Sequence, residues 1–150
     1  MKKDARIELL GSVWLFERCS RKELSLLASN ATLLATPPGK ILAREGEIGR
    51  EFFVIVSGKA EVTRHGSSLG VLGVGDFFGE MALLDRQRRS ATVTTIVDTD
   101  VLVLTSNAFV SVVESMPSVD RKMLTVLAER LRDLEERYVP SAERLLSVRV

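Results

Sequence analysis

The sequence predicts a mainly β domain, an antiparallel jelly roll with a helical N-terminal part and two C-terminal helices. Three observations predict this fold class. The first thirty residues are helical in pattern, short β-rich runs separated by Gly and Pro turn signals follow, and the apolar spacing becomes helical again from residue 106. Brief β runs without long helices between them favour antiparallel pairing. We expect one domain over 1–140, made of parts 1–30, 31–105 and 106–139, and a tail at 141–150.

The N-terminal part contains a clear helix start. Ser20 is followed three positions later by Glu23, which is the spacing of a capping box. Leu24 and Leu27 then place apolar side chains on one face of a helix. This pattern predicts a short helix from about Arg21 to Ser29.

The β part is a series of short runs. The segment "TPPGKILAREGE" (36–47) is a turn, a short strand and another turn, and "EFFVIVSGKAEVTRHG" (51–66) is two β runs around Ser57-Gly58. The runs "SSLGVLGVGDFF", "SATVTTIV" and "DVLVLTS" continue the series. His65, followed by Gly66, is expected at an exposed hairpin tip.

Two helices are predicted after residue 106. Pro117 ends the first of them, whose apolar residues at helical spacing are Phe109, Val112, Val113 and Met116. Ser118 can cap the second, which extends to about Tyr138 before Pro140. Its spacing of 3 and 4 is like that of a coiled coil, with a seam of Leu124, Leu127, Leu131, Leu134 and Tyr138. Two interpretations stay open for this seam: packing on the β roll, or pairing with a second copy.

Composition excludes several functional classes. A formal charge of +1 provides no bulk attraction to polyanions, so we expect no nucleic-acid binding by this chain on its own. Cys19 and His65 are the only residues of their types, which excludes an internal disulfide and metal centres built from several thiolates or imidazoles. No P-loop, dinucleotide fingerprint or nucleophile elbow is present, so we expect no enzyme. Without a signal peptide or a membrane span, the expected location is cytoplasmic.

The stretch "GDFFGEMALLDRQRRSATV" (75–93) carries the binding chemistry. Arg89 could pair a phosphate bidentately, and backbone N–H groups after Gly79 could help to hold it. Glu80 would repel a phosphate, but a carboxylate accepts a hydrogen bond from a sugar hydroxyl. One arginine and one glutamate in these roles describe a nucleotide with a single phosphate.

The segment "FGEMALLDRQRRSATV" (78–93) is similar to the phosphate-binding cassette of cyclic nucleotide-binding domains, as found in cAMP receptor proteins and protein kinase A regulatory subunits. The usual cassette reads F-G-E-[aliphatic]-A-L-[aliphatic]-x-x-x-P-R-[small]-A-[Thr/Ser]-V. The upstream glycines agree with this family, at Gly39, Gly46, Gly58 and Gly75. The resemblance covers roughly residues 10–138 and implies a β-roll, also called a double-stranded β-helix.

The resemblance implies a role for each matching residue. Arg89 would bind the cyclic phosphate and Glu80 the ribose 2′-hydroxyl. Leu83 would touch the helix that carries Phe109, so that ligand binding has a mechanical output. The implied ligand-binding set is Phe78, Gly79, Glu80, Met81, Ala82, Leu83, Arg89, Ser90, Ala91 and Val93.

The resemblance does not determine which nucleotide base is bound or which residues of the long helix contact it. Arg88 replaces the frequent proline of the cassette, and we expect its side chain to point to solvent. The expected ligand is cAMP, with cGMP as the alternative because Ser90 occurs in domains of both kinds, and no cofactor is expected. The long helix would cover the base, with Arg130, Leu134 and Tyr138 as the contacting candidates.

The resulting hypothesis is a regulatory sensor domain that couples cyclic nucleotide binding to movement of the C-terminal helix. Its predicted partners are a second copy, through the helix at 119–138, or an unidentified effector protein, and no membrane. The main alternative is a jelly-roll interaction domain that has lost its ligand. A purely structural interpretation of Glu80 and Arg89 is an internal salt bridge that braces a turn of the β roll. An enzyme is the least favoured class.

Overall fold

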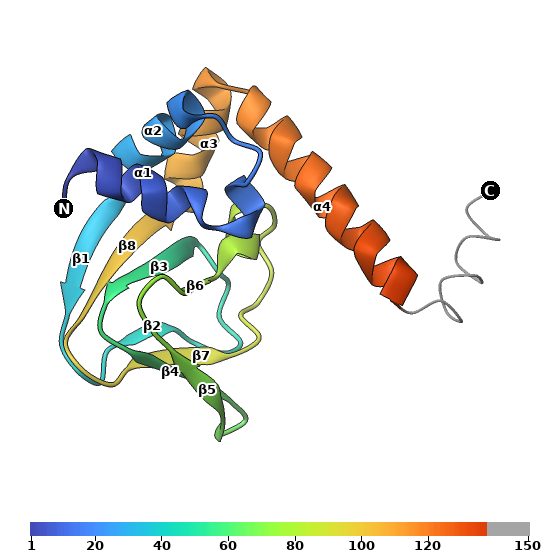
Figure 1. The fold of residues 1–150 in the computed structure, drawn as a ribbon. Helices are drawn as coiled ribbons and strands as arrows, with labels where there is room; N and C mark the ends of the chain where they lie inside the picture. The colour runs from blue at the N-terminus through green and yellow to red at the C-terminus, as the bar shows by residue number, and fades with distance from the viewer. Residues whose placement is uncertain (138–150) are drawn as a thin grey trace.

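The computed structural model describes residues 1–137, and its centre is a roll of two four-stranded antiparallel sheets (Figure 1). One sheet has the order β1 (Thr32–Thr36), β8 (Thr99–Thr105), β3 (Glu51–Ser57), β6 (Phe77–Phe78). The other has the order β2 (Ile41–Ala43), β7 (Thr92–Thr95), β4 (Ala60–Arg64), β5 (Ser67–Leu72). The predicted antiparallel jelly roll is confirmed. His65 joins β4 to β5 with a φ of 51° and an exposed side chain, as expected for a hairpin tip.

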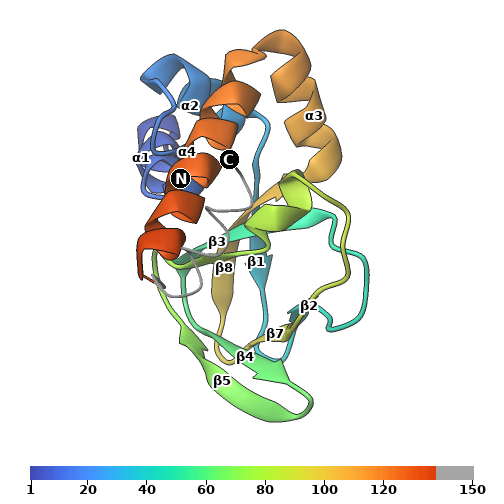
Figure 2. The ribbon, with the colours of Figure 1, turned by 90° about the vertical axis from the view of Figure 1, so that its right-hand side faces the viewer.

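The helices gather at one end of the roll (Figures 1 and 2). They are α1 (Lys3–Gly11), the 3-10 turn η1 (Trp14–Phe16), α2 (Arg21–Ser29), α3 (Ser106–Ser115) and α4 (Ser118–Arg137). None of the described helices has the length and apolar character needed to cross a membrane.

Strand β3 separates two hydrophobic cores. Alternate side chains of a strand point to opposite faces, so Phe52 and Val54 join a core shared with the helices, while Phe53 and Ile55 fill the interior of the roll. The helical core also contains Phe109, and the roll core contains Val93. One strand thereby couples the packing of the helical end to the shape of the roll.

Helix α2 has the predicted start and the predicted limits. The Ser20 hydroxyl accepts a hydrogen bond from the Glu23 amide at 3.2 Å, and Glu23 Oε1 accepts one from the Ser20 amide at 2.7 Å. Two of the amides that a helix start leaves without partners are thereby satisfied. The capping box is confirmed.

Helix α4 differs from its prediction in two respects. Ser118 is its first residue, and the Ser118 hydroxyl does not cap the helix but donates to Glu23 Oε2 at 2.5 Å. The side chains that pack inward are Val119, Met123 and Val126, all fully buried. The predicted seam is instead largely exposed, at 59% for Leu124, 55% for Leu131 and 50% for Leu134. The interpretation that the seam packs on the roll is therefore wrong for these three leucines, and Tyr138 lies outside the described residues.

Helix α4 packs against η1 and α3, and its inward-facing side chains at 119, 123 and 126 follow a helical i, i+4, i+7 spacing. The predicted seam has the same steps of 3 and 4 residues but is displaced by one position along the chain, so it lies on a neighbouring face of the helix. Pairing of that face with a second copy stays a prediction.

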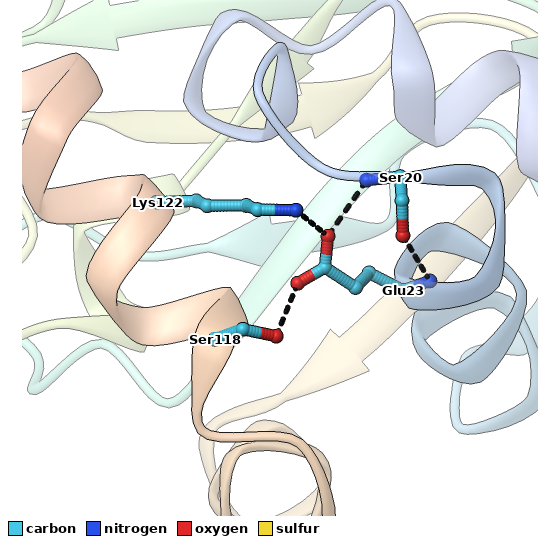
Figure 3. A network of polar contacts seen from close by, with 4 residues as sticks. All are labelled: Ser20, Glu23, Ser118 and Lys122. Atoms are coloured by element: carbon cyan, nitrogen blue, oxygen red, sulfur yellow. Dashed lines mark hydrogen bonds and ion pairs between the residues drawn. The ribbon is translucent and has the colours of Figure 1, made fainter.

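The buried carboxylate of Glu23 joins α2 to α4 (Figure 3). Besides closing the capping box, it accepts hydrogen bonds from the Ser118 hydroxyl and from the Lys122 ammonium group, although these residues lie about a hundred positions along the chain. Burial alone would raise the pKa of the Glu23 carboxyl. The hydrogen bonds from Lys122, Ser118 and Ser20 outweigh burial and lower that pKa from 4.5 to about 2.

The first prediction concerns the acid sensitivity of this network. Because the folded-state pKa of Glu23 is lowered, the network stabilises the fold fully above pH 4.5 and loses its contribution as the pH falls toward 2. We expect the free energy of unfolding, measured by urea denaturation, to fall over this range more in the wild type than in Glu23→Gln. At neutral pH, Glu23→Gln should cost about 1–3 kcal/mol. Glu17→Gln, at an exposed position outside the network, is the control. Equal pH profiles for the wild type and Glu23→Gln would contradict this account.

Candidate functional site

A cavity of about 430 Å³ opens between the segment 78–93 and the β4–β5 hairpin. It contains every residue of the predicted binding set except Leu83. Those that line it are Phe78, Gly79, Glu80, Met81, Ala82, Arg89, Ser90, Ala91 and Val93. Residues that the cassette pattern predicted to form one binding site therefore line a single cavity in the structure.

Gly79 lies at the bend that shapes the bottom of this cavity. Pairing of β6 with β3 places Phe78 opposite Phe53, and the chain then turns at Gly79, with a φ of 78°, into the 3-10 turn η2 (Glu80–Leu83). A Cβ atom at Gly79 would lie 2.4 Å from Nη1 of Arg89 and 2.8 Å from the carbonyl oxygen of Glu51. Only glycine fits both the left-handed backbone and the close approach of the guanidinium group.

The guanidinium group of Arg89 is half-buried against the backbone at Gly79. Its Nη2 donates to the carbonyl oxygen of Glu51 at 2.7 Å, and its Cζ lies 6.0 Å from the centre of the Phe53 ring. Burial lowers the pKa of Arg89, and the nearby Glu51 and Glu80 carboxylates partly offset that effect. Arginine nevertheless stays protonated in proteins. The result is a positive charge in the cavity wall, and only one hydrogen bond from this guanidinium group to the described residues is formed.

Glu80 is the first residue of η2 and lines the same cavity. Among residues 1–137, Arg89 forms no ion pair within 4.0 Å, so the internal Glu80–Arg89 salt bridge of the alternative interpretation is not formed. Both groups therefore remain available to a bound molecule.

Arg88 differs from its prediction. Its side chain is exposed, but it does not simply point to solvent, because Nη1 donates to the carbonyl oxygen of Gly46 at 2.7 Å and the residue lines the cavity. Its backbone also forms an isolated β bridge with Ile48. The bond to Gly46 ties the cassette to the turn that precedes β3.

Sequence reasoning missed the wall opposite the cassette. Val62, Leu69 and Leu72 supply its apolar surface, and Arg64 stands at its edge, with Nε donating to the carbonyl oxygen of Ser90 at 2.9 Å. Alternation along β4 was an available signal, since Ala60, Val62 and Arg64 share a face. The contribution of Leu69 had no such signal, because it depends on the bulge in the pairing of β4 with β5.

Leu83 points away from the cavity into the helical core. It is 7% exposed and belongs to the same core as Phe109, and η2 packs against α3. The short η2 turn therefore has one side on the cavity and the other on the helices, as the resemblance implied for Leu83.

The proposed contacts from α4 to a base are not in place. No residue of α4 among those described lines the cavity, and Leu134 is exposed. The guanidinium group of Arg130 instead lies over the Trp14 ring, 4.4 Å from its centre. In this structure α4 therefore does not cover the cavity, and the expectation that it covers a bound base stays a prediction. Tyr138 lies outside the described part of the chain.

Metal binding has no counterpart in the part of the chain that the structure describes. No group of three or more His, Cys, Asp or Glu side chains comes close enough together in residues 1–137 to hold a metal ion. The chemistry of the cavity is that of charged and hydrogen-bonding groups.

Comparisons with known proteins agree with this geometry. The chain is 31% identical over 126 residues to the cyclic AMP receptor protein of Thermus thermophilus, which covers 81% of this chain and 58% of that protein. It is 41% identical over 97 residues to the cAMP-dependent protein kinase regulatory subunit of Mycosarcoma maydis, covering 62% of this chain and 18% of that subunit. The chain thus spans less than two thirds of either relative.

Solved structures give the same result for the fold. The N-terminal domain of a transcriptional regulator from Streptomyces coelicolor A3(2) matches with a TM-score of 0.78 at 25% identity, covering 84% of this chain and 94% of that chain. The family model described as "Cyclic nucleotide-binding domain" matches residues 33–116, more than half of the chain. With the cavity, the glycine bend and the half-buried arginine in their expected places, this chain belongs to the cyclic nucleotide-binding domain family.

Proposed function

We propose that the chain is a non-catalytic sensor domain that binds a cyclic nucleotide, with cAMP as its ligand and cGMP as the alternative, and passes the signal to its C-terminal helix. The observation that carries this proposal is the guanidinium group of Arg89, half-buried over Gly79 at the edge of a cavity and without a carboxylate partner among the described residues. The two relatives described above carry cAMP in their names, whereas other relatives are named cGMP-dependent protein kinase, so cGMP stays the alternative.

The charges around the cavity suit a ligand with one phosphate. Three arginines, at positions 64, 88 and 89, face the two carboxylates of Glu80 and Asp85 in its wall. The excess of one positive charge matches the single negative charge of a cyclic phosphate diester. Arg89 would bind that phosphate, because its guanidinium group already lies beside the Gly79 backbone, where no side chain obstructs it.

The remaining walls suit the sugar and the base. Glu80 is a hydrogen-bond acceptor for the ribose 2′-hydroxyl. The apolar surface of Val62, Leu69 and Leu72 faces the cassette across the cavity and would contact the base. Ser90, Ala91 and Val93 complete the wall next to Arg89 with small or apolar side chains.

The route from ligand to helix starts at η2. Movement of Glu80 and Ala82 toward a bound ligand would displace Leu83, which lies in the core shared with Phe109 of α3. A ligand that binds one arrangement of η2 more tightly would shift the population toward it, and α4 follows α3 directly along the chain. Movement of α4 over the base would then be part of the response.

A second copy, bound through the helix at 119–138, or an effector protein would receive the signal, in the cytoplasm. The alternative is an interaction domain that has lost its ligand, and titration with cyclic nucleotides distinguishes it from a sensor domain.

The second prediction tests the phosphate contact. Arg89→Ala should cost about 2–5 kcal/mol of binding free energy in isothermal titration with cAMP or cGMP, because a desolvated charged partner is lost. Arg88→Ala should cost less, and Arg86→Ala, at an exposed position outside the cavity, should bind like the wild type. A larger loss for Arg88→Ala would reassign the phosphate to Arg88. No binding by nucleotide-free wild type would favour the ligand-free alternative.

The third prediction tests the ribose contact. Wild type should bind 2′-deoxy-cAMP about 1.5–3 kcal/mol more weakly than cAMP, because a hydrogen bond to a charged group is lost. In Glu80→Gln the difference between the two ligands should shrink. Asp85→Asn removes a carboxylate from the same cavity and should leave the difference at its wild-type size. An unchanged difference in Glu80→Gln would remove Glu80 from the ribose.

The fourth prediction tests the close approach at Gly79. Gly79→Ala and Gly75→Ala both place a side chain at positive φ, which costs about 1–2 kcal/mol of stability in each. A Cβ at Gly75 meets open space, whereas one at Gly79 collides with Arg89. We therefore expect only Gly79→Ala to weaken cAMP binding, by at least about tenfold, or 1.4 kcal/mol. Equal affinities of the two variants would show that Arg89 need not lie against the backbone at Gly79.

A further inference from the structure

Arg89 is held in place by a second segment of the chain, the residues 44–50 between β2 and β3, which we call the β2–β3 loop. In Figure 2 this loop runs beside the segment that joins η2 to β7, at one edge of the roll. Three backbone hydrogen bonds join the two segments: from the Gly46 amide to the Arg89 carbonyl oxygen at 2.9 Å, from the Arg89 amide to the Glu47 carbonyl oxygen at 2.7 Å, and from the Gly49 amide to the Gln87 carbonyl oxygen at 3.0 Å. The loop therefore fixes the main chain at Arg89, although it lies outside the cassette.

The same loop also meets the side chain of Arg89, at Gly49. A Cβ atom at Gly49 would lie 3.1 Å from both Cζ and Nε of Arg89 and 3.3 Å from the Cβ atom of Ala82. These distances are shorter than a favourable van der Waals contact, so a side chain at position 49 would displace a neighbour. The backbone does not require glycine here, because Gly49 lies outside the left-handed region. The close approach of the guanidinium group is therefore the physical reason for a glycine at position 49.

Three neighbours together surround the guanidinium group. Gly79 approaches Nη1, Gly49 approaches Nε and Cζ, and the carbonyl oxygen of Glu51 accepts a hydrogen bond from Nη2 at 2.7 Å. We call these three residues the arginine slot. Each nitrogen of the group has one of them as a neighbour, so the position of the group is set before a ligand binds. A group that is already in place loses less conformational freedom when the ligand arrives.

A second cavity gives the guanidinium group a place to go if the slot is filled. This cavity has a volume of about 220 Å³, and Arg89 lines it as well as the first cavity. Glu47 and Glu51 also line the second cavity, and carboxylates attract a cation. Gly49 lines only the first cavity. A side chain at position 49 would therefore displace the guanidinium group toward the second cavity and away from the ligand.

We propose that Gly49 is a positioning residue for the phosphate contact, because it leaves the space in which the β2–β3 loop holds the guanidinium group of Arg89 against the ligand cavity. The inference rests on the proposed function, since it concerns the same site. It adds to that site a part from outside the cassette. The cassette supplies the positive charge, and the β2–β3 loop determines where that charge lies.

The arginine slot can be tested without a ligand, by urea denaturation of the wild type, Gly49→Ala, Arg89→Ala and the double variant. Gly49→Ala should lower the urea midpoint of the wild type, because the added Cβ atom and the guanidinium group compete for the same space. In the Arg89→Ala background the same substitution should leave the midpoint unchanged or raise it, since the group that it collides with is gone.

Gly73→Ala is the matched control for this comparison. Gly73 also lies outside the left-handed region, and a Cβ atom there would have no other atom within 4 Å. Gly73→Ala should therefore leave the urea midpoint unchanged or raise it, both in the wild type and in the Arg89→Ala background.

Isothermal titration measures the consequence for the ligand. Gly49→Ala should bind cAMP about three- to tenfold more weakly than the wild type, and Gly49→Val, with its larger side chain, at least about tenfold more weakly. Gly73→Ala should bind like the wild type. The loss in Gly49→Ala should be the same factor for cAMP and cGMP, because the two ligands share the phosphate and differ in the base. A purely structural role for Gly49 would lower the urea midpoint without this loss of affinity.

The outcomes separate this inference from the proposed function. A midpoint lowered only when Arg89 is present, together with an equal loss for both nucleotides, supports the proposal. An equal effect of Gly49→Ala on the midpoint in both backgrounds overturns the slot, and wild-type affinity in Gly49→Val overturns the positioning role. In both cases binding by the wild type leaves the proposed function standing. If the wild type binds neither nucleotide, the proposed function and the positioning role both fail, and the urea measurements still decide whether the slot exists.

Discussion

The half-buried guanidinium group of Arg89 is the constraint on which the site depends. Removing a cation from water is costly unless other groups replace its hydration. Here the replacement comes from the Glu51 carbonyl oxygen of β3 and from the Phe53 ring, and Gly79 leaves the space that the group needs. The pairing of β3 with β6 brings these together. The arrangement satisfies only part of the donor capacity of Arg89, which makes the site receptive to an anion.

The same strand connects the site to the helical end. Phe53 lies under Arg89, whereas its neighbour Phe52 points to the opposite face and packs in the core with Phe16 and Phe109. Leu83 joins that core from the far side of η2. A tightly packed core transmits displacement instead of absorbing it. Packing thus joins the cavity wall to the helical core, and the buried Glu23 joins α2 to the first turns of α4.

Local sequence patterns correctly predicted the elements that are stabilised by residues close together in the sequence. The Ser20 and Glu23 capping box predicted α2 because both partners lie within one helical turn. The cassette predicted the cavity residues from Phe78 to Val93 because they follow one another along the chain with a glycine at the bend. Where the cause was distant, prediction failed. Arg88 binds the Gly46 carbonyl oxygen and Arg130 lies over the Trp14 ring. Neither contact could be predicted from the residues next to these arginines in the sequence.

By itself, the sequence determined the class of fold, the family and most of the residues that line the cavity on the cassette side, because alternation, turn signals and a continuous motif are properties of short segments. The tertiary structure decided which face of α4 is buried, that Glu23 serves two helices at once, and that β4 and β5 close the cavity opposite the cassette. These features depend on contacts between residues far apart in the chain, such as Glu23 with Lys122, and on a bulge in the pairing of β4 with β5.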